Sequence, residues 1–101
     1  MSKIYLSGPV SGLDIEHARE LFAAAQKEMA EQGWECVNPM SNGLPVEAPW
    51  EEHLALDILN LFNCKAIAML PGWETSCGAR LEHALAKRIG LRIINLKNIT
   101  K

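Results

Sequence analysis

Long apolar runs are missing from this sequence of 101 residues. No segment approaches the roughly 20 apolar residues that a transmembrane helix requires. The first residues, MSKIYLSG, hold one lysine and no extended apolar stretch, so we expect no secretory signal. The sequence therefore predicts a chain without a membrane partner.

Cysteine is scarce, and its spacing excludes the usual disulfide frameworks and metal sites. The three cysteines, which form no C-x-x-C pair, are Cys36, Cys64 and Cys77. We interpret them as free thiols, which predicts a protein of the reducing cytoplasm. The histidines also lack the spacing of metal ligands; they are His17, His53 and His83. No metal is implied.

An excess of basic residues is absent as well. Ten lysines and arginines stand against 12 aspartates and glutamates, a formal net charge of −2. Without a basic face to compensate phosphates, a nucleic-acid polymer is not an expected partner. A small anionic ligand is not excluded, because a few local donors suffice for it. Neither G-x-x-x-x-G-K-[ST] nor G-x-G-x-x-G occurs, so no nucleotide cofactor is implied.

What the sequence does contain is a regular alternation of strand and helix patterns, which predicts one domain over 1–101. Strands are predicted at 3–7, 34–37, 65–70 and 91–96. Helices are predicted at about 13–32, 49–63 and 76–89. This βαβαβαβ order predicts a flavodoxin-like α/β fold, a three-layer sandwich with a four-stranded parallel sheet of order 2-1-3-4.

Apolar stripes at helical spacing indicate which helix faces are buried. In the first helix the stripe comprises Ala18, Leu21, Phe22, Ala25 and Met29. In the second helix the predicted inner stripe comprises Leu54, Ile58, Leu61 and Phe62.

The predicted strand order also predicts where a ligand binds. In such sheets the site lies beyond the carboxyl ends of the strands, where the order reverses between the first and third strands. Two loops rich in Gly, Pro and Ser meet there, SGPVSG at 7–12 and PGWETSCG at 71–78. We therefore expect the functional residues to gather around these loops.

The segment Ser76-Cys77-Gly78 stands at the predicted start of the third helix. Free N–H groups and the positive end of the helix dipole make such a start an anion site, and Gly78 would let a ligand approach closely. A plain N-cap at Ser76, with Gly78 chosen for packing, explains the same residues. Both interpretations stay open at this point.

Two carboxylates stand in apolar surroundings. Glu82 follows Leu81 about one and a half turns into the third helix, and Asp57 sits mid-helix beside Ile58. If both face the carboxyl edge of the sheet, they form the pair of acids that cleaves glycosidic bonds. Ordinary solvent exposure of either acid is the alternative.

Three aromatic residues lie near the predicted site. Tyr5 could hydrogen-bond the carboxylate or stack on a ligand, and it could equally be a core residue. Trp50 and Trp73 bracket the site and could hold a flat base between them, although packing alone explains either one.

Taken together, IYLSGPVSG at 4–12, the pair Asp57-Ile58 and S-x-G-A-R-x-E at 76–82 resemble the nucleoside 2-deoxyribosyltransferase superfamily. The chain is most similar to a small phage and bacterial branch with the same loop pattern, in element order over almost its whole length. The resemblance implies that Glu82 is the nucleophile, that Asp57 assists it and the leaving base, and that Tyr5 is the tyrosine of the first motif. It also implies that Ser76, with Gly78, receives a 5′-phosphate.

The chain departs from the superfamily's pattern in the first loop and near its end. Ser11 stands where related nucleotide hydrolases carry a basic residue, and Pro9 replaces a small polar one. Superfamily members also receive a residue from a partner subunit, out of a segment beyond the fourth strand, whereas this chain ends at Lys101. Either another segment completes the site, or the chemistry is weakened or lost.

The resulting hypothesis is an enzyme, a homodimer or higher homo-oligomer, that cleaves or transfers the N-glycosidic bond of a 2′-deoxynucleoside 5′-monophosphate. The predicted cradle for sugar and phosphate comprises Ser7, Gly8, Ser11, Ser76 and Gly78. A non-catalytic module that binds a nucleotide or nucleotide-sugar is the alternative, with Glu82 only hydrogen-bonded to a ribose.

Overall fold

The computed structural model describes residues 2–10, 14–41, 43–45 and 47–97, and the predicted Ser11 lies outside them. The strands are β1 (Lys3–Ser7), β2 (Glu35–Val37), β3 (Ala66–Met69) and β4 (Arg92–Asn95). The helices are α1 (Ile15–Glu31), α2 (Trp50–Phe62) and α3 (Cys77–Ile89), with short 3-10 turns η1 (Pro39–Ser41) and η2 (Trp73–Thr75). The predicted alternation of strands and helices is confirmed.

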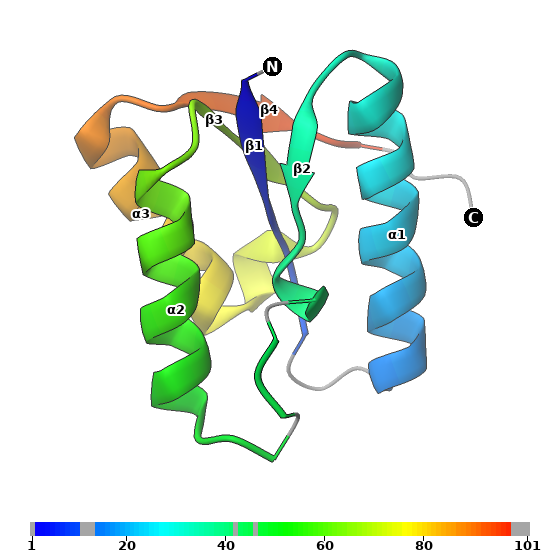
Figure 1. The fold of residues 1–101 in the computed structure, drawn as a ribbon, viewed down its shortest axis with the longest axis vertical. Coiled ribbons are helices and arrows are strands. Elements are labelled where there is room, and N and C mark those ends of the chain that lie inside the picture. The colour runs from blue at the N-terminus through cyan, green and yellow to red at the C-terminus, as the bar shows by residue number, and fades with distance from the viewer. Residues whose placement is uncertain (1, 11–13, 42, 46, 98–101) are drawn as a thin grey trace.

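All strand pairs of the sheet are parallel, and the order is β2-β1-β3-β4, as predicted. The helix α1 covers one face of the sheet, and α2 and α3 cover the other, which gives three layers (Figure 1). This arrangement follows from right-handed crossovers, because the chain turns back after β2 to place β3 on the far side of β1.

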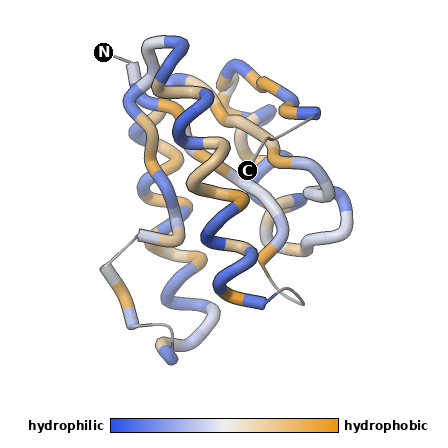
Figure 2. Tube along the Cα trace, turned by 90° about the vertical axis from the view of Figure 1, so that its right-hand side faces the viewer, coloured by the Kyte–Doolittle hydropathy of each residue, from blue (hydrophilic) through white to orange (hydrophobic). Residues whose placement is uncertain are grey.

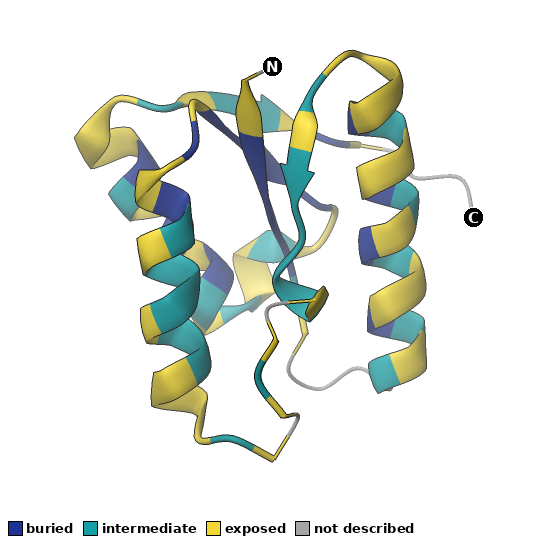
Figure 3. Ribbon diagram, in the orientation of Figure 1, coloured by how far each residue is buried: buried dark blue, intermediate teal, exposed yellow. Residues whose placement is uncertain are grey.

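The side chains of β1 divide between the two faces because successive residues of a strand point in opposite directions. Ile4 and Leu6 pack in the cluster under α1, whereas Tyr5 packs in the cluster under α2 and α3. β1 and β3 are the most deeply buried strands (Figure 3). The alternation therefore turns Tyr5 and Ser7 toward α3, the helix that carries Glu82.

The apolar stripe of α1 is confirmed: Ala18, Phe22, Ala25 and Met29 are buried, and Leu21 packs against their cluster. Asp14 caps the helix by accepting a hydrogen bond from the His17 N–H at 3.4 Å. Hydrophilic and hydrophobic stretches alternate along the helices in Figure 2, as expected for helices with one buried face.

The predicted stripe of α2 is wrong at one position. Leu61 is completely buried, but Phe62 is 54% exposed and Leu59 is 63% exposed. Consecutive helical residues are about 100° apart, so a helix that turns Leu61 to the sheet turns Phe62 away from it. Among the described residues no helix combines the length and apolarity needed to cross a membrane.

Candidate functional site

A cavity of about 300 Å³ opens beyond the carboxyl ends of the central strands, where the strand order predicts a ligand site. Gly8 and Val10, which follow β1, form part of its wall, and Ser76 and Gly78 at the start of α3 form another part. Its volume lies at the small end of the range for small-molecule sites.

Glu82 lines this cavity and is only 6% exposed. The Tyr5 hydroxyl donates a hydrogen bond to Oε2 of Glu82 at 2.8 Å, and the Ser7 hydroxyl donates one to Oε1 at 2.6 Å. Both donors come from β1, whose odd-numbered residues face α3. Each carboxylate oxygen can accept more than one hydrogen bond, so the arrangement orients the group without using up its lone pairs.

Burial raises the pKa of Glu82 to about 7. The hydrogen bonds from Ser7 and Tyr5 oppose this rise because they favour the ionised carboxylate, and the negative charge of Asp57 adds to it. Burial, and then the nearby charges of Glu82 and Asp57, raise the pKa of Tyr5 well above its usual value. Tyr5 therefore stays protonated, and it remains a hydrogen-bond donor throughout the pH range in which Glu82 titrates.

Asp57 reaches the same cavity from α2. Its Oδ1 atom is buried, and its charge acts on both Glu82 and Tyr5. The two acids therefore converge on one cavity, one from each helix of the layer, instead of lying on the outer surface.

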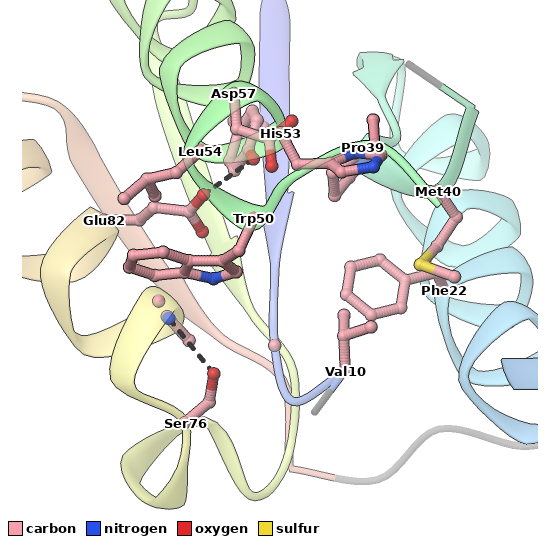
Figure 4. Close-up of a pocket in the computed structure, with 15 residues that line it drawn as sticks. Val10, Phe22, Pro39, Met40, Trp50, His53, Leu54, Asp57, Ser76 and Glu82 are labelled. Atoms are coloured by element: carbon pink, nitrogen blue, oxygen red, sulfur yellow. Dashed lines mark hydrogen bonds between the residues drawn. The ribbon is translucent and has the colours of Figure 1, made fainter. Parts of the chain in front are cut away.

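Trp50, the first residue of α2, lines the cavity although 53% of it is exposed. In the view of Figure 4 its indole extends into the cavity on the side of Glu82 and Ser76, while Val10, Phe22 and Met40 gather on the opposite side. A flat ring entering the cavity would thus meet an aromatic surface on one side and apolar side chains on the other.

Trp73, which was predicted to bracket the site with Trp50, packs against α3 and is not among the residues that line the cavity. Trp73 stacks on His83 of α3, with ring centroids 4.3 Å apart and an interplanar angle of 22°, and it does not line the cavity. The reason is its place in η2, the turn between β3 and α3, which packs back against α3. The alternative that packing explains Trp73 therefore accounts for its position.

Ser76 is the N-cap of α3, and its Oγ accepts a hydrogen bond from the Ala79 N–H at 3.2 Å. The cap does not exclude the anion site, because the Ser76 hydroxyl hydrogen can still donate. A Cβ added at Gly78 would have no heavy atom within 4 Å, so no packing contact explains the glycine. Gly78 keeps the cavity wall open at the positive end of the helix dipole.

Two residues of the predicted cradle have other tasks. Ser7 is 1% exposed and gives its hydroxyl hydrogen to Glu82, so it supports the carboxylate instead of touching a ligand. Gly8 does line the cavity, but a Cβ there would lie 2.7 Å from Cβ of Leu70. The glycine is needed so that the chain can leave β1 against Leu70.

A comparison with protein families matches residues 2–95 to a domain of unknown function, DUF4406. The chain belongs to the DUF4406 family. A comparison with curated proteins found no match. The DUF4406 match spans every residue that lines the cavity, so the site is part of the DUF4406 domain itself.

The sequence patterns missed part of the DUF4406 site. His53 lies one helical turn before Asp57 on α2, lines the cavity, and donates from Nε2 to the Pro45 carbonyl at 3.0 Å. This bond ties the loop after η1 to α2. The i, i+4 spacing from His53 to Asp57 was a usable signal, because such residues share one helix face.

The apolar wall of the DUF4406 cavity was also missed. It includes Phe22 of α1 and Met40 of η1. Sequence patterns assigned Phe22 to the core, and it is indeed buried, but its ring also reaches the cavity. Among the described residues no group of three or more His, Cys, Asp or Glu side chains is placed to hold a metal ion.

Proposed function

We propose that this DUF4406 domain cleaves or transfers the N-glycosidic bond of a 2′-deoxynucleoside 5′-monophosphate, with Glu82 as the nucleophile. The observation that carries the proposal is the buried Glu82 carboxylate, whose two oxygens are held by the Tyr5 and Ser7 hydroxyls inside a ligand-sized cavity. The motif resemblance to nucleoside 2-deoxyribosyltransferases supports the same assignment.

In the first step an oxygen of ionised Glu82 attacks C1′ of the sugar. The bond from C1′ to the base nitrogen breaks, and its electron pair leaves with the base. Tyr5 and Ser7 hold the carboxylate in one orientation, so little ordering is needed on the way to the transition state. Water or a second base then attacks C1′ and releases Glu82.

Asp57 acts on the departing base in this scheme. In retaining glycosidases the two acids stand about 5–5.5 Å apart, one as nucleophile and one as proton donor and acceptor. Asp57 enters the cavity from α2 and Glu82 from α3, and the charge of Asp57 acts on Glu82, which supports assigning the two acids to one reaction. The base nitrogen takes up a proton as the bond breaks, and Asp57 would direct that proton to it.

The start of α3 would receive the 5′-phosphate. Ser76 and Gly78 line the cavity at the start of α3, where the first-turn amides without an intrahelical partner make the positive end of the helix dipole. The open space beside Gly78 allows an oxygen to approach the backbone. A free 2′-deoxynucleoside would lose these contacts.

We also propose that the domain acts as a homodimer in the cytoplasm. Leu59 and Phe62 leave an apolar patch on the outer side of α2, and a second copy of the chain would cover it. Sedimentation equilibrium measures the association. A wild-type protein that stays monomeric at tens of micromolar would contradict the dimer.

The activity is tested by incubating the protein with each 2′-deoxynucleoside 5′-monophosphate and separating free base by chromatography. Wild-type protein should release base, and Glu82→Gln should lower the rate by at least about a thousandfold, as for loss of a nucleophile. Glu74→Gln, an exposed acid on η2, is the matched control and should leave the rate unchanged. Base release that survives Glu82→Gln would remove Glu82 from the mechanism.

One observation favours the alternative of a binding module. Both Glu82 oxygens already accept a hydrogen bond from the protein, so the carboxylate also suits a polar floor that only receives a ligand hydroxyl. The same assay separates the two functions. Tight binding of a nucleotide by calorimetry, without release of base over many hours, would favour the module.

A further inference from the structure

The wall of the cavity divides into a polar and an apolar side according to the elements that form it. Its polar side chains come from β1, α2 and the first turns of α3 with their cap; they are Tyr5, His53, Asp57, Ser76 and Glu82. Among the described residues, α1, η1 and the chain after β1 add only apolar side chains to the wall. We call these the apolar side: Val10, Phe22, Pro39 and Met40.

The backbone of η1 adds no free N–H donor to the apolar side. Pro39 has no N–H, and the Met40 N–H donates to Oδ1 of Asn38 at 2.9 Å. The Ser41 N–H donates to the Asn38 carbonyl at 3.0 Å. A ligand acceptor placed against η1 would therefore give up its hydrogen bonds to water without replacement from these groups, which is costly. An apolar group placed there has no such bond to lose.

The proposed function determines which part of a nucleotide reaches the apolar side. With C1′ at Glu82 and the 5′-phosphate at the start of α3, the sugar and the phosphate both lie along α3. Val10, Phe22 and Met40 lie across the cavity from Glu82 and Ser76 (Figure 4). The base is the part of the nucleotide that remains to extend across the cavity, so one edge of the base meets the apolar side.

The two edges of a pyrimidine suit this division. When the ring is joined to the sugar through N1, the polar atoms O2 and N3 lie on one edge and the carbons C5 and C6 on the other. Asp57, which acts on the departing base, belongs to α2, so the polar edge faces α2. The carbon edge then turns away from α2 toward Phe22 of α1 and Met40 of η1, which belong to the apolar side.

The two edges of a purine do not suit it. A purine joined to the sugar through N9 carries N3 on one edge, and N7 with the C6 substituent on the other. Either orientation therefore places polar atoms against the apolar side. A buried polar group without a partner costs enough to discriminate between ligands by an order of magnitude.

We infer that the apolar side selects a pyrimidine nucleotide whose C5 carries an apolar group the size of a methyl. This inference rests on the proposed function and narrows its substrate class. The competing explanation is that the apolar side only keeps water from Glu82. In that case a methyl group on C5 would make no contact and would not change the affinity.

The test compares thymidine 5′-monophosphate with 2′-deoxyuridine 5′-monophosphate, which differ by one methyl group on C5. The Kd values are measured by calorimetry with wild-type protein and with Glu82→Gln, in which slow turnover leaves the nucleotide intact. The methyl group should lower Kd about fourfold, the effect of burying one such group. The 2′-deoxynucleoside 5′-monophosphates of adenine and guanine should bind roughly tenfold more weakly than the thymidine nucleotide. Free base is measured in the wild-type samples.

Two variants and a matched control locate the effect. Val10→Thr and Met40→Gln keep the approximate size of each side chain and place a polar atom on the apolar side, so each should reduce the methyl preference to below about twofold. Ile89→Thr is the control, because Ile89 is 37% exposed, close to the 36% of Val10, and ends α3 away from the cavity. It should leave the fourfold preference unchanged. Circular dichroism confirms that each variant is folded, and Val10→Thr alone suffices if Met40→Gln does not fold.

The outcomes separate this inference from the proposed function. Equal Kd values for the thymidine and 2′-deoxyuridine nucleotides, or purine nucleotides that bind as tightly as the thymidine nucleotide, would overturn the inference even if base is released. A methyl preference that Val10→Thr leaves intact would also overturn it. A methyl preference that Val10→Thr removes and Ile89→Thr keeps supports it. The same preference without release of base from wild-type samples overturns the proposed glycosidase alone, and binding of none of the four nucleotides overturns both.

Discussion

Tyr5 on β1 donates its phenolic hydrogen to Oε2 of Glu82 on α3 at 2.8 Å, across 77 positions of sequence. The bond links one of the two most deeply buried strands to a helix that lines the cavity. It serves the fold and the chemistry together, because it satisfies a buried carboxylate and also fixes its orientation. The parallel sheet makes it possible by aiming Tyr5 and Ser7 at the same helix.

Tyr5→Phe should move the pH dependence of base release upward. The Tyr5 hydrogen bond favours ionised Glu82, so its loss raises the pKa of Glu82 above its value of about 7. A hydrogen bond to a charged group is worth roughly one pKa unit or more, so the midpoint of the rate profile should rise by about one unit. Rates across pH 6–9, a range that includes the expected midpoints of about 7 and about 8, measure this. A lower rate with an unshifted midpoint would contradict the assigned role.

Ser7→Ala tests the hydrogen bond to the second carboxylate oxygen, Oε1 of Glu82. It should shift the midpoint in the same direction, because the Ser7 bond also lowers the pKa of Glu82. The exposed Ser2 provides the control Ser2→Ala, which should leave the profile unchanged.

Stability should fall as the pH rises through the range in which Glu82 titrates. The pKa of Glu82 is raised from 4.5 to about 7 on folding, so the folded state holds this proton more tightly than the unfolded chain does. The stabilisation is complete below the unfolded value and disappears as the pH rises from about 4.5 to about 7. Linkage gives a loss of about 3 kcal/mol for such a shift.

Urea unfolding between pH 4.5 and pH 8 measures this loss, with Glu82→Gln as the comparison. Asp57, Tyr5 and His53 are the other titratable groups that line the cavity, and they stay in both proteins. The variant should therefore lose only the part of the pH dependence of the free energy of unfolding that belongs to Glu82. Parallel stability curves for the two proteins would contradict the assignment of the slope to Glu82.

Gly78→Ala should stabilise the fold and weaken ligand binding. Alanine is favoured over glycine in a helix by about 1 kcal/mol, and the added methyl meets open space. That space belongs to the cavity, so the methyl should reduce the affinity for a 5′-monophosphate several-fold. Thermal unfolding and calorimetry measure the two effects, and unchanged affinity would exclude a ligand beside Gly78.

Gly8→Ala is the contrasting change at the same cavity. Its methyl would lie 2.7 Å from Cβ of buried Leu70, so the chain or the core must shift. We expect a loss of roughly 1–3 kcal/mol in the free energy of unfolding, as for other overpacked sites.

Local patterns predicted most of the fold because they report directly on burial. The uninterrupted apolar run at 66–70 contains the central strand β3, and the i, i+3, i+4 stripe of α1 became the buried face of that helix. Phe62 was assigned wrongly because a short helix with apolar residues on several sides leaves its rotation about the axis undetermined. Only packing against the sheet and α3 decides that Leu61 faces inward.

Site residues could be predicted from the sequence where the helix that carries them fixes their position. Glu82 and Asp57 reach one cavity because their helices, α3 and α2, cover the same face of the sheet. The stacking of Trp73 on His83 could not be predicted, because the Trp73 side chain leaves a turn, where neither helical nor strand periodicity indicates its direction. The His53 contact to the Pro45 carbonyl depends on how a long loop folds back, which the sequence pattern does not report.

The last prediction separates the two tasks of Ser76. Ser76→Ala removes both the cap and the hydroxyl, and loss of a serine cap costs about 1 kcal/mol of stability. Ser76→Gly also removes the hydroxyl but costs only a few tenths of a kcal/mol, since glycine is a tolerated cap. If the hydroxyl binds the 5′-phosphate, both variants should raise the KM for a 2′-deoxynucleoside 5′-monophosphate about equally, by roughly tenfold. Neither should change the KM for the free 2′-deoxynucleoside. Steady-state kinetics with both substrates measures this, and a KM that follows stability, rising for Ala but not for Gly, would show that Ser76 is a cap alone.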